Sequence, residues 1–288
     1  DALEVPVVLS EGCADPYGEK TVRASMGAVF RTHPQQAAAA DLIAACRSGS
    51  IPLAVTALTE DACDLRSAVL GELAALGVAP DALSGILVTH EHSDHIRSVG
   101  ALSRRFNLPV YASEGTWQAM EDKVQGVALR NRRAFCAGQD FFVGGLGVQP
   151  FSIPHDAADP VGFCLHYAGR KVAVATDLGC LQAGWLQAVS GAHALLIESN
   201  HDPDMLARGP YPAALKRRIR GRRGHLANEE CARALEQLLP TGLRGVMLGH
   251  LSGENNLPEL AYEAAHRALS ALGARVGEDV SLEVARRD

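Results

Sequence analysis

The chain has 288 residues, of which 47% are hydrophobic and 21% charged, so it can bury a large core as one domain or as two fused halves. Its formal net charge of −6 argues against a strongly basic nucleic-acid-binding protein, although a local patch of cations can still bind phosphate. The longest alanine-rich stretch is interrupted by Asp41 and has no basic flank, so the sequence predicts neither a membrane span nor a signal peptide.

The seven cysteines form an odd, unpatterned set without a C-x-x-C motif. Such a set argues against a disulfide framework or a structural zinc finger, and it favours a reducing compartment, so we expect a cytoplasmic protein. The cysteines are Cys13, Cys46, Cys63, Cys136, Cys164, Cys180 and Cys231.

A cluster of histidines follows directly after an apolar run. The run Ile86-Leu87-Val88 predicts a buried strand over residues 85–89, whose end would lie where open α/β sheets place their ligands. The first two histidines can converge on one cation, while an aspartate and a third histidine, at the start of the next helix, can face a second. Imidazole suits zinc, and the carboxylate widens the choice to manganese or iron. The candidate ligands are His90, His92, Asp94 and His95.

The remaining elements alternate between strands and helices. Strand 85–89, helix 94–106 and strand 109–112 form a β-α-β unit, so this sheet is predicted to be partly parallel. Further strands are expected at 141–143, 148–153, 161–167, 171–176, 194–197 and 243–248, with a hairpin at 168–170. Helices are expected at 181–189, 213–219, 228–239 and 259–272. These elements fit an α/β fold of four layers, an αββα sandwich with two sheets back to back and helices outside.

Three more candidate ligands stand at the ends of predicted strands, namely His155, Asp177 and His250. Each is weak evidence alone, because a single histidine or aspartate at a strand end is more often a cap or a surface residue. In this order after a complete H-x-H-x-D-H motif, however, they resemble the signature of the metallo-β-lactamase superfamily.

The superfamily resemblance implies two divalent metal ions, zinc or manganese, that activate water. It implies that His90, His92 and His155 hold one ion. It implies that Asp94, His95 and His250 hold the other and that Asp177 bridges them.

A closer resemblance lies within residues 195–262. The segments that carry it are Leu196-Ile197-Glu198-Ser199-Asn200-His201-Asp202, Gly209-Pro210-Tyr211-Pro212, Leu215-Lys216-Arg217-Arg218-Ile219, Gly224-His225-Leu226-Ala227-Asn228 and His250-Leu251-Ser252. They look like the YycJ/WalJ (VicX) family, and the match runs from about Leu76 to Ala261. The family implies a metal-dependent phosphodiesterase, regarded as a nuclease, with 5′-to-3′ exonuclease action on DNA in preference to RNA. The segments are also similar to tRNase Z, which implies that Glu198 and His225 form a catalytic pair outside the metal shell. The expected catalytic residues are therefore Asp94, Glu198 and His225.

The chemistry of phosphodiester hydrolysis gives that pair a role. Two metal ions about 3.5–4 Å apart can activate the nucleophile and stabilise the phosphoryl oxygens, but neither supplies a proton to the leaving oxygen. A histidine next to a glutamate suits that task, because its ordinary pKa is about 6.5 and the carboxylate raises it. The alternative for His225 is a turn that caps the helix beginning near Asn228.

A run of cations precedes His225. Phosphate contacts of this kind supply most of the sequence-independent affinity for nucleic acid, whereas the alternative is a solvated helix face. The expected phosphate contacts are Lys216, Arg217, Arg218, Arg220, Arg222 and Arg223, with Ser252 and Asn255 from the strand-end loop after His250.

Residues 1–70 depart from the family. Family members open with a strand, a Gly-Ser-rich turn and a second strand that ends in Asp-x-Gly, whereas this chain has only Ser48-Gly49-Ser50 and no Asp-x-Gly after it. We hypothesise that this stretch is a divergent extension or the product of a shifted reading frame or start, and that residues 71–288 form the hydrolase domain.

Two other functions are compatible with such a metal site. In the first, the metal ions polarise the carbonyl of a lactone, thioester or β-lactam, and no acid at His225 is required. In the second, the protein is a non-catalytic regulator. The Glu198/His225 pair and the basic run favour a nuclease over the first, and seven ligands argue against the second, because structural zinc sites close with four.

Overall fold

The computed structural model describes residues 8–9, 35–36, 70, 73–74 and 77–285. The hypothesis about residues 1–70 therefore falls almost wholly outside the described residues; within that stretch, β1 (Val8–Leu9) and β2 (Gln35–Gln36) pair in parallel. The chain divides into two compact units, residues 1–148 with 157–159 and residues 149–156 with 160–288. Each unit is described by itself.

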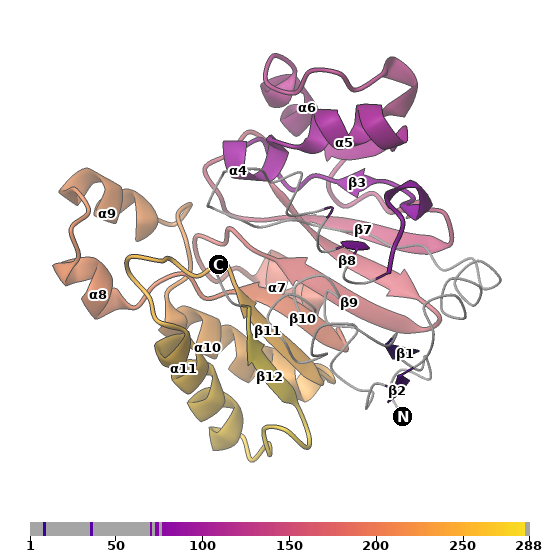
Figure 1. Cartoon of the computed structure of the whole chain (residues 1–288). Coiled ribbons are helices and arrows are strands. Elements are labelled where there is room, and N and C mark those ends of the chain that lie inside the picture. The colour runs from indigo at the N-terminus through magenta and orange to yellow at the C-terminus, as the bar shows by residue number, and fades with distance from the viewer. Residues whose placement is uncertain (1–7, 10–34, 37–69, 71–72, 75–76, 286–288) are drawn as a thin grey trace. The chain divides into compact units, whose positions relative to one another are not determined.

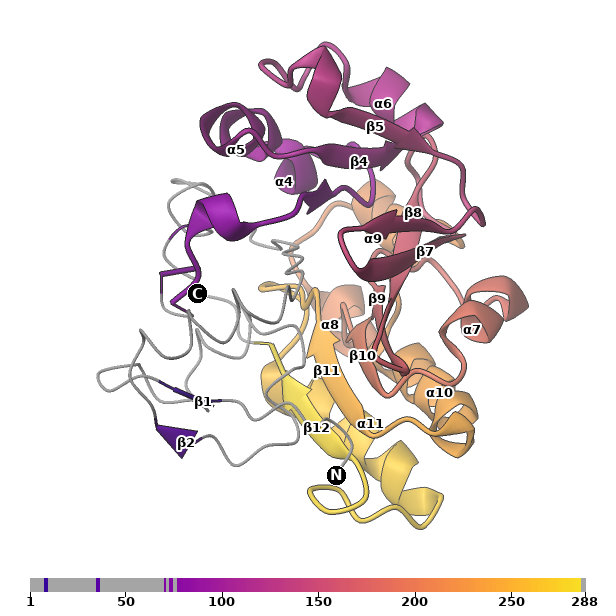
Figure 2. The same ribbon diagram turned by 90° about the vertical axis from the view of Figure 1, so that its right-hand side faces the viewer.

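The first unit contains a small parallel sheet. Its strands lie in the order β3 (Ile86–Leu87), β4 (Val110–Ser113) and β5 (Arg132–Phe135), and the parallel pairing of β3 with β4 confirms the predicted β-α-β unit. Helices α5 (Val99–Phe106) and α6 (Glu114–Met120) accompany these strands (Figures 1 and 2). A core of Val88, Val99, Val110 and Met120, with their neighbours, joins them. Two short 3₁₀ turns, Pro80–Ala82 and Leu129–Asn131, also belong to this unit.

The predicted helix over residues 94–106 is wrong in one respect, because it occurs as two helices. The first, α4 (Ser93–Ile96), is a single turn, and α5 begins only at Val99. The chain at Gln125 lies against the start of α5 so closely that a Cβ on Gly100 would stand 2.0 Å from the Gln125 carbonyl oxygen. The gap between α4 and α5 thus lies next to a site of close tertiary packing at Gly100, which the hydrophobic period of the sequence does not reveal.

The second unit contains most of a seven-stranded sheet. The strand order is β12 (Ser281–Val284), β11 (Gly245–Gly249), β10 (Ala194–Glu198), β9 (Arg170–Ala175), β8 (Val161–Tyr167), β7 (Leu146–Ser152) and β6 (Phe141–Val143). Strands β6 and β7 pair antiparallel within the first unit, and β7 then continues into the second. The predicted hairpin joins β8 and β9, where Ala168 and Gly169 have φ angles of 47° and 73°.

Three helices pack against one face of this sheet and form a hydrophobic core with it. Residues of α7 (Ala183–Val189), α10 (Asn228–Leu238) and α11 (Pro258–Ala271) share one hydrophobic cluster with β9 to β12, and Trp185 is its largest fully buried side chain. Figure 2 shows these three helices together on the same side of the strands. A 3₁₀ turn, Leu239–Thr241, follows α10. Two short helices, α8 (Pro203–Arg208) and α9 (Ala213–Ile219), lie between β10 and α10 in the chain.

Among the α-helices and strands described within residues 77–285, four were not predicted from the sequence, namely α6, β5, α8 and β12. Two of them had readable signals: Ser113 and Asp202 accept hydrogen bonds from the amides of Thr116 and Met205, as N-cap residues do. No helix among the described residues is long and apolar enough to cross a membrane.

The direction of the strands positions the candidate ligands. Strands β9, β10 and β11 run parallel, so their carboxyl ends share one edge of the sheet. Asp177 comes two residues after β9, Glu198 is the last residue of β10, and His250 follows β11 directly. Side chains that are far apart in the sequence are thereby brought to one place.

Candidate metal centre

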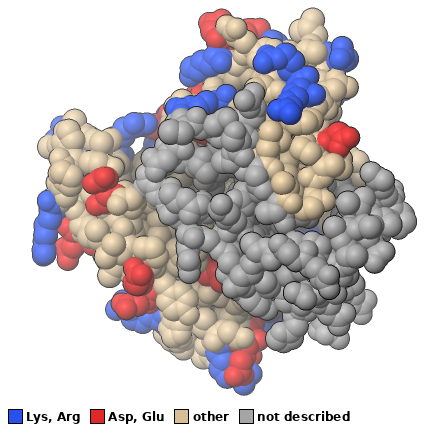
Figure 3. All heavy atoms as spheres, viewed as in Figure 1, with Lys and Arg blue, Asp and Glu red and all other residues tan. Residues whose placement is uncertain are grey.

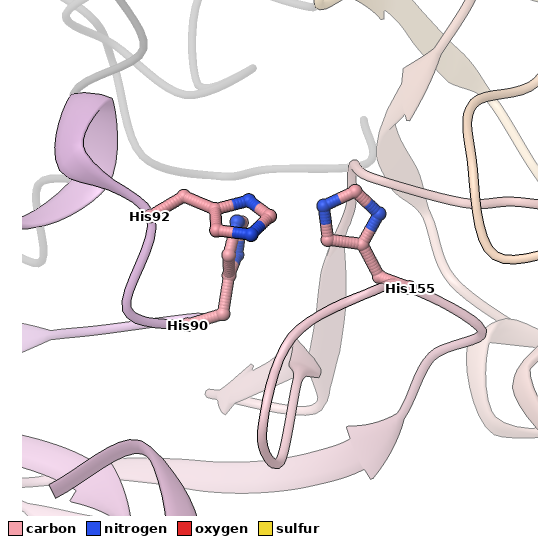
Figure 4. Close-up of side chains that lie close together, drawn as sticks. All are labelled: His90, His92 and His155. Atoms are coloured by element: carbon pink, nitrogen blue, oxygen red, sulfur yellow. The ribbon is translucent and has the colours of Figure 1, made fainter. Parts of the chain in front are cut away.

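The first unit gathers three histidines at the end of β3. His90 and His92 lie on the loop between β3 and α4, and Figure 4 shows the two rings close together. Their ring centroids are 4.5 Å apart and the rings meet edge to face, while the rings of His90 and His95 are 4.0 Å apart. Asp94 and His95 belong to α4, as the sequence indicated, and an oxygen of Asp94 lies 3.6 Å from Nε2 of His95.

Thr89 orients two of these histidines, a role that the sequence did not indicate. Its hydroxyl oxygen lies 3.1 Å from Nδ1 of His90 and 3.1 Å from Nδ1 of His95. A hydroxyl oxygen has two lone pairs and can accept from both rings. Each ring would then use its other nitrogen, Nε2, for a metal ion, as is usual for metal-binding histidines.

Glu91, between the first two histidines, ties the motif to the rest of the first unit. Its side chain is buried, and one carboxylate oxygen accepts a hydrogen bond of 2.8 Å from the amide of Ala158. Next to it, the carbonyl of Asp159 accepts from the hydroxyls of Ser113 and Thr116. These bonds hold the short segment 157–159 against the motif-bearing unit.

Two candidate ligands in the second unit have unusual backbone conformations. Asp177 and His250 have φ angles of 59° and 57°, in the left-handed region that residues with a Cβ seldom adopt. Such conformations are typically retained where the surrounding structure and the function of a site require them. Both residues stand at the shared edge of β9 and β11.

Asp177 lies between two histidines of the second unit. One oxygen, Oδ1, is 3.6 Å from Nε2 of His155 and 3.6 Å from Nε2 of His250. Two ligand atoms that each lie about 2.0–2.2 Å from one ion are roughly 3–4 Å apart. The carboxylate therefore has the separation from each histidine that a shared metal ion requires.

The hydrogen bonds of His155 and His250 determine which nitrogen is available for metal. Nδ1 of His155 lies 3.2 Å from the carbonyl oxygen of Gly224, and Nδ1 of His250 lies 2.6 Å from Oε1 of Glu198. Both partners can only accept, so Nδ1 carries the proton and Nε2 keeps its lone pair. In the neutral rings, Nε2 is thus the nitrogen that is available to a metal ion. His155 lies in the turn that follows β7, and Figure 4 shows its ring.

Glu198 is completely buried and accepts hydrogen bonds from four groups. Oε1 accepts from Nδ1 of His225 at 2.8 Å and from Nδ1 of His250, and Oε2 accepts from the amides of Leu178 and Leu226. Burial raises the pKa of this carboxyl, but the opposing charges and hydrogen bonds of His225 and His250 outweigh burial and lower the pKa to about 2. The side chain is thus an ionised acceptor whose oxygens are engaged by protein donors.

His225 lies between His155 and His250, two of the candidate metal ligands of the second unit. Its ring centroid is 5.1 Å from that of His155 and 5.1 Å from that of His250. Burial lowers the pKa of this imidazole, but the charge and hydrogen bond of Glu198 outweigh burial, so the pKa is raised above its ordinary value. Its side chain is 21% exposed, so a substrate can reach it.

The observed residues fit a divalent metal ion. Four of the candidate histidines have Nδ1 within hydrogen-bond distance of a protein oxygen, which fixes the ring and directs Nε2 away from that oxygen. The donor set of imidazoles and carboxylates suits zinc or manganese. The four are His90, His95, His155 and His250.

The cations of the segment 216–223 differ in what they contact. Lys216 donates to the carbonyls of Ala207 and Gly209, and Arg220 donates to that of Pro203. Arg218 and Arg223 contact the turn that carries His155. In the described part of the chain, the side chains of Arg217 and Arg222 are exposed and have no hydrogen bond or ion pair. Figure 3 shows cations near α8 and α9, with a few acidic side chains among them.

The two expected contacts after His250 lie in different surroundings. Ser252 is partly exposed, and its hydroxyl accepts a hydrogen bond from the amide of Asn255. Asn255 is fully buried, so its side chain faces the interior. Its carbonyl accepts from the amide of Asp202, which ties the loop after β11 to the loop after β10.

A buried polar network, absent from the sequence-based expectations, lies beside Glu198. The hydroxyl of Ser199 donates to Asn228, the amides of Asn228 and Asn256 bond to each other, and Asn256 also donates to the carbonyl of Ser199. These residues join the end of β10, the start of α10 and the loop after His250. The adjacent Asn255-Asn256 pair in the sequence was the available signal.

Comparison with known proteins identifies the family. Residues 64–250 match the family model described as the β-lactamase superfamily domain. The chain is 41% identical over 196 residues to exodeoxyribonuclease YycJ of Bacillus anthracis, covering 68% of this chain and 74% of that protein. The chain belongs to the YycJ/WalJ family of the metallo-β-lactamase superfamily.

Further similarity supports the same assignment. Exodeoxyribonuclease WalJ of Streptococcus pneumoniae is 38% identical over 209 residues, covering 72% of this chain and 78% of that protein. The crystal structure of Zn²⁺-bound PqqB from Methylobacterium extorquens has a TM-score of 0.60 at 18% identity and covers 82% of each chain, which supports the fold. These similarities confirm the predicted metallo-β-lactamase fold, and the chain is an enzyme of this hydrolase class.

Proposed function

We propose that this enzyme is a metal-dependent exonuclease that acts on DNA in the 5′-to-3′ direction. The observation that carries the proposal is the 2.8 Å hydrogen bond between Glu198 and His225, beside Asp177 and His250, in a chain related to two exodeoxyribonucleases. A carbonyl hydrolase needs no such acid, whereas the leaving oxygen of a phosphodiester does. The unpatterned cysteines favour action in the cytoplasm.

The proposed metal centre uses the seven ligands that the family resemblance implies. His90, His92 and His155 would hold one ion; Asp94, His95 and His250 would hold the other; and Asp177 would bridge them. The fixed Nδ1 atoms and the equal distances from Asp177 to His155 and His250 support this assignment. When bound, two such ions supply Lewis acidity and a nucleophile at neutral pH, and either zinc or manganese suits the ligands.

His225 is proposed to donate the proton that the leaving oxygen needs. Glu198 accepts from Nδ1, so Nε2 is the atom left to face substrate. The ionised carboxylate stabilises the imidazolium and raises its pKa, so more of the ring is protonated at neutral pH than for an isolated histidine. Glu198 itself is buried and acts through His225 and His250.

The exposed cations next to His225 are proposed to hold the phosphate backbone. Arg217 and Arg222 have no protein partner among the described residues, so their guanidinium groups are available for phosphate. Ser252, two residues after His250 and partly exposed, could contribute a hydroxyl.

The test is hydrolysis of end-labelled DNA and RNA by the purified enzyme. Single- and double-stranded substrates labelled at the 5′ or the 3′ end would be incubated after chelation and re-addition of Mn²⁺ or Zn²⁺. We expect metal-dependent release of mononucleotides, with the 5′ label released first and DNA cleaved in preference to RNA.

Two controls make the result interpretable. The His225→Ala variant should remove most activity from the same preparation, which excludes a contaminating nuclease. No cleavage by an enzyme with two bound metal ions, together with hydrolysis of a lactone or thioester, would contradict the proposal and favour a carbonyl substrate.

A further inference from the structure

We infer that Asp156, Arg218 and Arg223 position the proposed metal ligand His155 and do not contact substrate phosphate. The inference rests on the proposed metal centre. On this inference, the basic run over residues 216–223 contains arginines that hold the His155 turn and arginines that are available to DNA.

An ion pair joins α9 to the residue after His155. Arg218 donates from Nε to Oδ2 of Asp156 at 2.5 Å and from Nη2 to Oδ1 at 3.2 Å, so the contact is bidentate. The pair raises the pKa of Arg218, chiefly through the hydrogen bond to Asp156. Oδ1 of Asp156 is also 3.5 Å from Nε2 of His155, the nitrogen that would bind metal. Arg218 therefore fixes a carboxylate next to the proposed metal-binding atom.

The backbone of His155 is held from the same segment. Nε of Arg223 donates to the carbonyl oxygen of His155 at 2.8 Å, and the carbonyl of Gly224 accepts from the ring of His155 at 3.2 Å. Together with the Arg218 pair, the segment 218–224 contacts the main chain, the ring and the neighbouring carboxylate of this one turn. Few conformations of the His155 ring satisfy all of these contacts.

Close packing explains how the segment stays in place. A Cβ on Gly179 would lie 2.4 Å from the carbonyl oxygen of Arg222, and a Cβ on Gly224 would lie 2.2 Å from that of Ile219. The amide of Gly179 in turn donates to the carbonyl of Pro154 at 2.8 Å. The segment 218–224 thus packs directly against the backbone at Gly179, two residues after Asp177, and Gly179 in turn bonds to the His155 turn.

The guanidinium groups of Arg218 and Arg223 are engaged by these contacts, although both residues are exposed. A phosphate that bound Arg218 would have to displace a bidentate carboxylate. Arg217 and Arg222 carry no such partner within the described residues. In the basic run, residues that contact the His155 turn therefore lie directly next to residues that are available to phosphate, namely Arg218 next to Arg217 and Arg223 next to Arg222.

The experiment measures metal affinity, which a phosphate-binding residue would not affect. Zn²⁺ binding to the metal-free full-length enzyme would be followed by titration against a chelating indicator for the wild type and for Arg218→Ala, Arg218→Lys and Asp156→Ala. We expect Arg218→Ala to weaken the binding of one of the two ions by about 10- to 100-fold, the usual effect of removing a group that orients a ligand. Arg218→Lys should restore the affinity only in part, because a lysine cannot form the bidentate contact.

A second ion pair on the same unit supplies the matched control. Arg275 and Asp279 also form an exposed bidentate contact, with bonds of 3.0 and 2.9 Å, in the turn before β12. The Arg275→Ala variant should bind both ions as the wild type does. The double variant Asp156→Ala/Arg218→Ala should bind no more weakly than the worse single variant, because the two residues act through each other.

The outcomes separate this inference from the proposed function. Wild-type affinity for both ions in Arg218→Ala, with metal bound by the wild type, would overturn the inference and leave the metal centre intact. A wild-type enzyme that binds no metal would overturn the proposed function. A fall in affinity of equal size in Arg275→Ala would show a general loss of stability and would also overturn the inference.

Discussion

Glu198 shows how one buried residue can serve two functions at the candidate site. Its Oε1 accepts from both His225 and His250, one the proposed acid and the other a proposed metal ligand. The sequence-based resemblance paired Glu198 with His225 alone. The structure adds His250, so the loss of this carboxylate should affect more than proton transfer.

Substitution of His225 and of Glu198 should therefore have different effects. We expect His225→Ala to lower kcat for DNA hydrolysis by about 10²- to 10⁴-fold with unchanged metal content, on the scale of general acid catalysis. Glu198→Gln should lower kcat and also metal occupancy, because a neutral amide no longer stabilises the protonated Nδ1 of His250. Turnover on end-labelled DNA and metal analysis of each protein would check this. Full activity of His225→Ala would remove His225 from the mechanism.

The bridging role that we propose for Asp177 gives another prediction at this scale. Its Oδ1 is equally distant from His155 and His250, so Asp177→Ala should reduce metal occupancy below two ions. Metal analysis after dialysis against a weak chelator would measure it. Occupancy by two ions in that variant would contradict the bridge.

The cysteines differ in expected reactivity. Burial raises the pKa of the Cys231 thiol to about 12, so at pH 8 the thiol stays protonated and unreactive, whereas Cys136 is exposed. Treatment of the folded enzyme with iodoacetamide at pH 8, followed by peptide mapping, should show modification at Cys136 and none at Cys231. Equal modification of both thiols in the folded protein would contradict the described core.

At the scale of elements, the turn after β9 and the segment after α9 depend on a glycine. A Cβ on Gly179 would lie 2.4 to 2.5 Å from backbone atoms of Arg222 and Arg223. We expect Gly179→Ala to destabilise the protein by about 1–3 kcal/mol, the usual cost of overpacking. The control is Gly184→Ala in α7, where nothing lies within 4 Å and the change should be neutral or stabilising by up to about 1 kcal/mol. Urea denaturation would measure both, and equal stability of the two variants would contradict the packing argument.

The basic segment makes a prediction about salt. The logarithm of the DNA-binding constant K falls linearly with the logarithm of the salt concentration. For duplex DNA, each phosphate contact that is lost reduces the magnitude of this slope by about 0.9. Arg217→Ala and Arg222→Ala should each lower this slope by about that amount, whereas Arg233→Ala, an exposed arginine on α10, should leave it unchanged. Equilibrium binding of a fluorescent duplex at several salt concentrations would check it. An unchanged slope in both variants would place the DNA elsewhere.

At the scale of the whole molecule, the proposed centre combines ligands that are far apart in the sequence, from His90 to His250, and it therefore needs the folded chain. Metal that binds only the folded chain should therefore stabilise the protein, by about 2.7 kcal/mol when free metal is 100-fold above Kd. Thermal unfolding with Zn²⁺ and with EDTA would measure the change in Tm. If the protein has the same Tm with Zn²⁺ and with EDTA, the ions do not bind a folded site.

The sequence alone determined most elements and the identity of the candidate ligands. Hydrophobic period and turn residues placed strands such as 141–143 and 161–167 where the structure has them, because those patterns are local. The break between α4 and α5, the short helix α8 and the edge strand β12 were missed, because long-range packing and caps decide them. The motif H-x-H-x-D-H pointed to metal by residue type and spacing.

Only the tertiary structure decided how these residues are arranged. Parallel strands β9, β10 and β11 bring Asp177, Glu198 and His250 to one edge, and hydrogen bonds across the fold engage Nδ1 of His155 and His250, which leaves Nε2 of each for the proposed metal ions. The same contacts engage Arg218 while Arg217 remains exposed. A sequence specifies which groups are present and their local conformation, but the partner of each group depends on residues tens of positions away that only folding brings near.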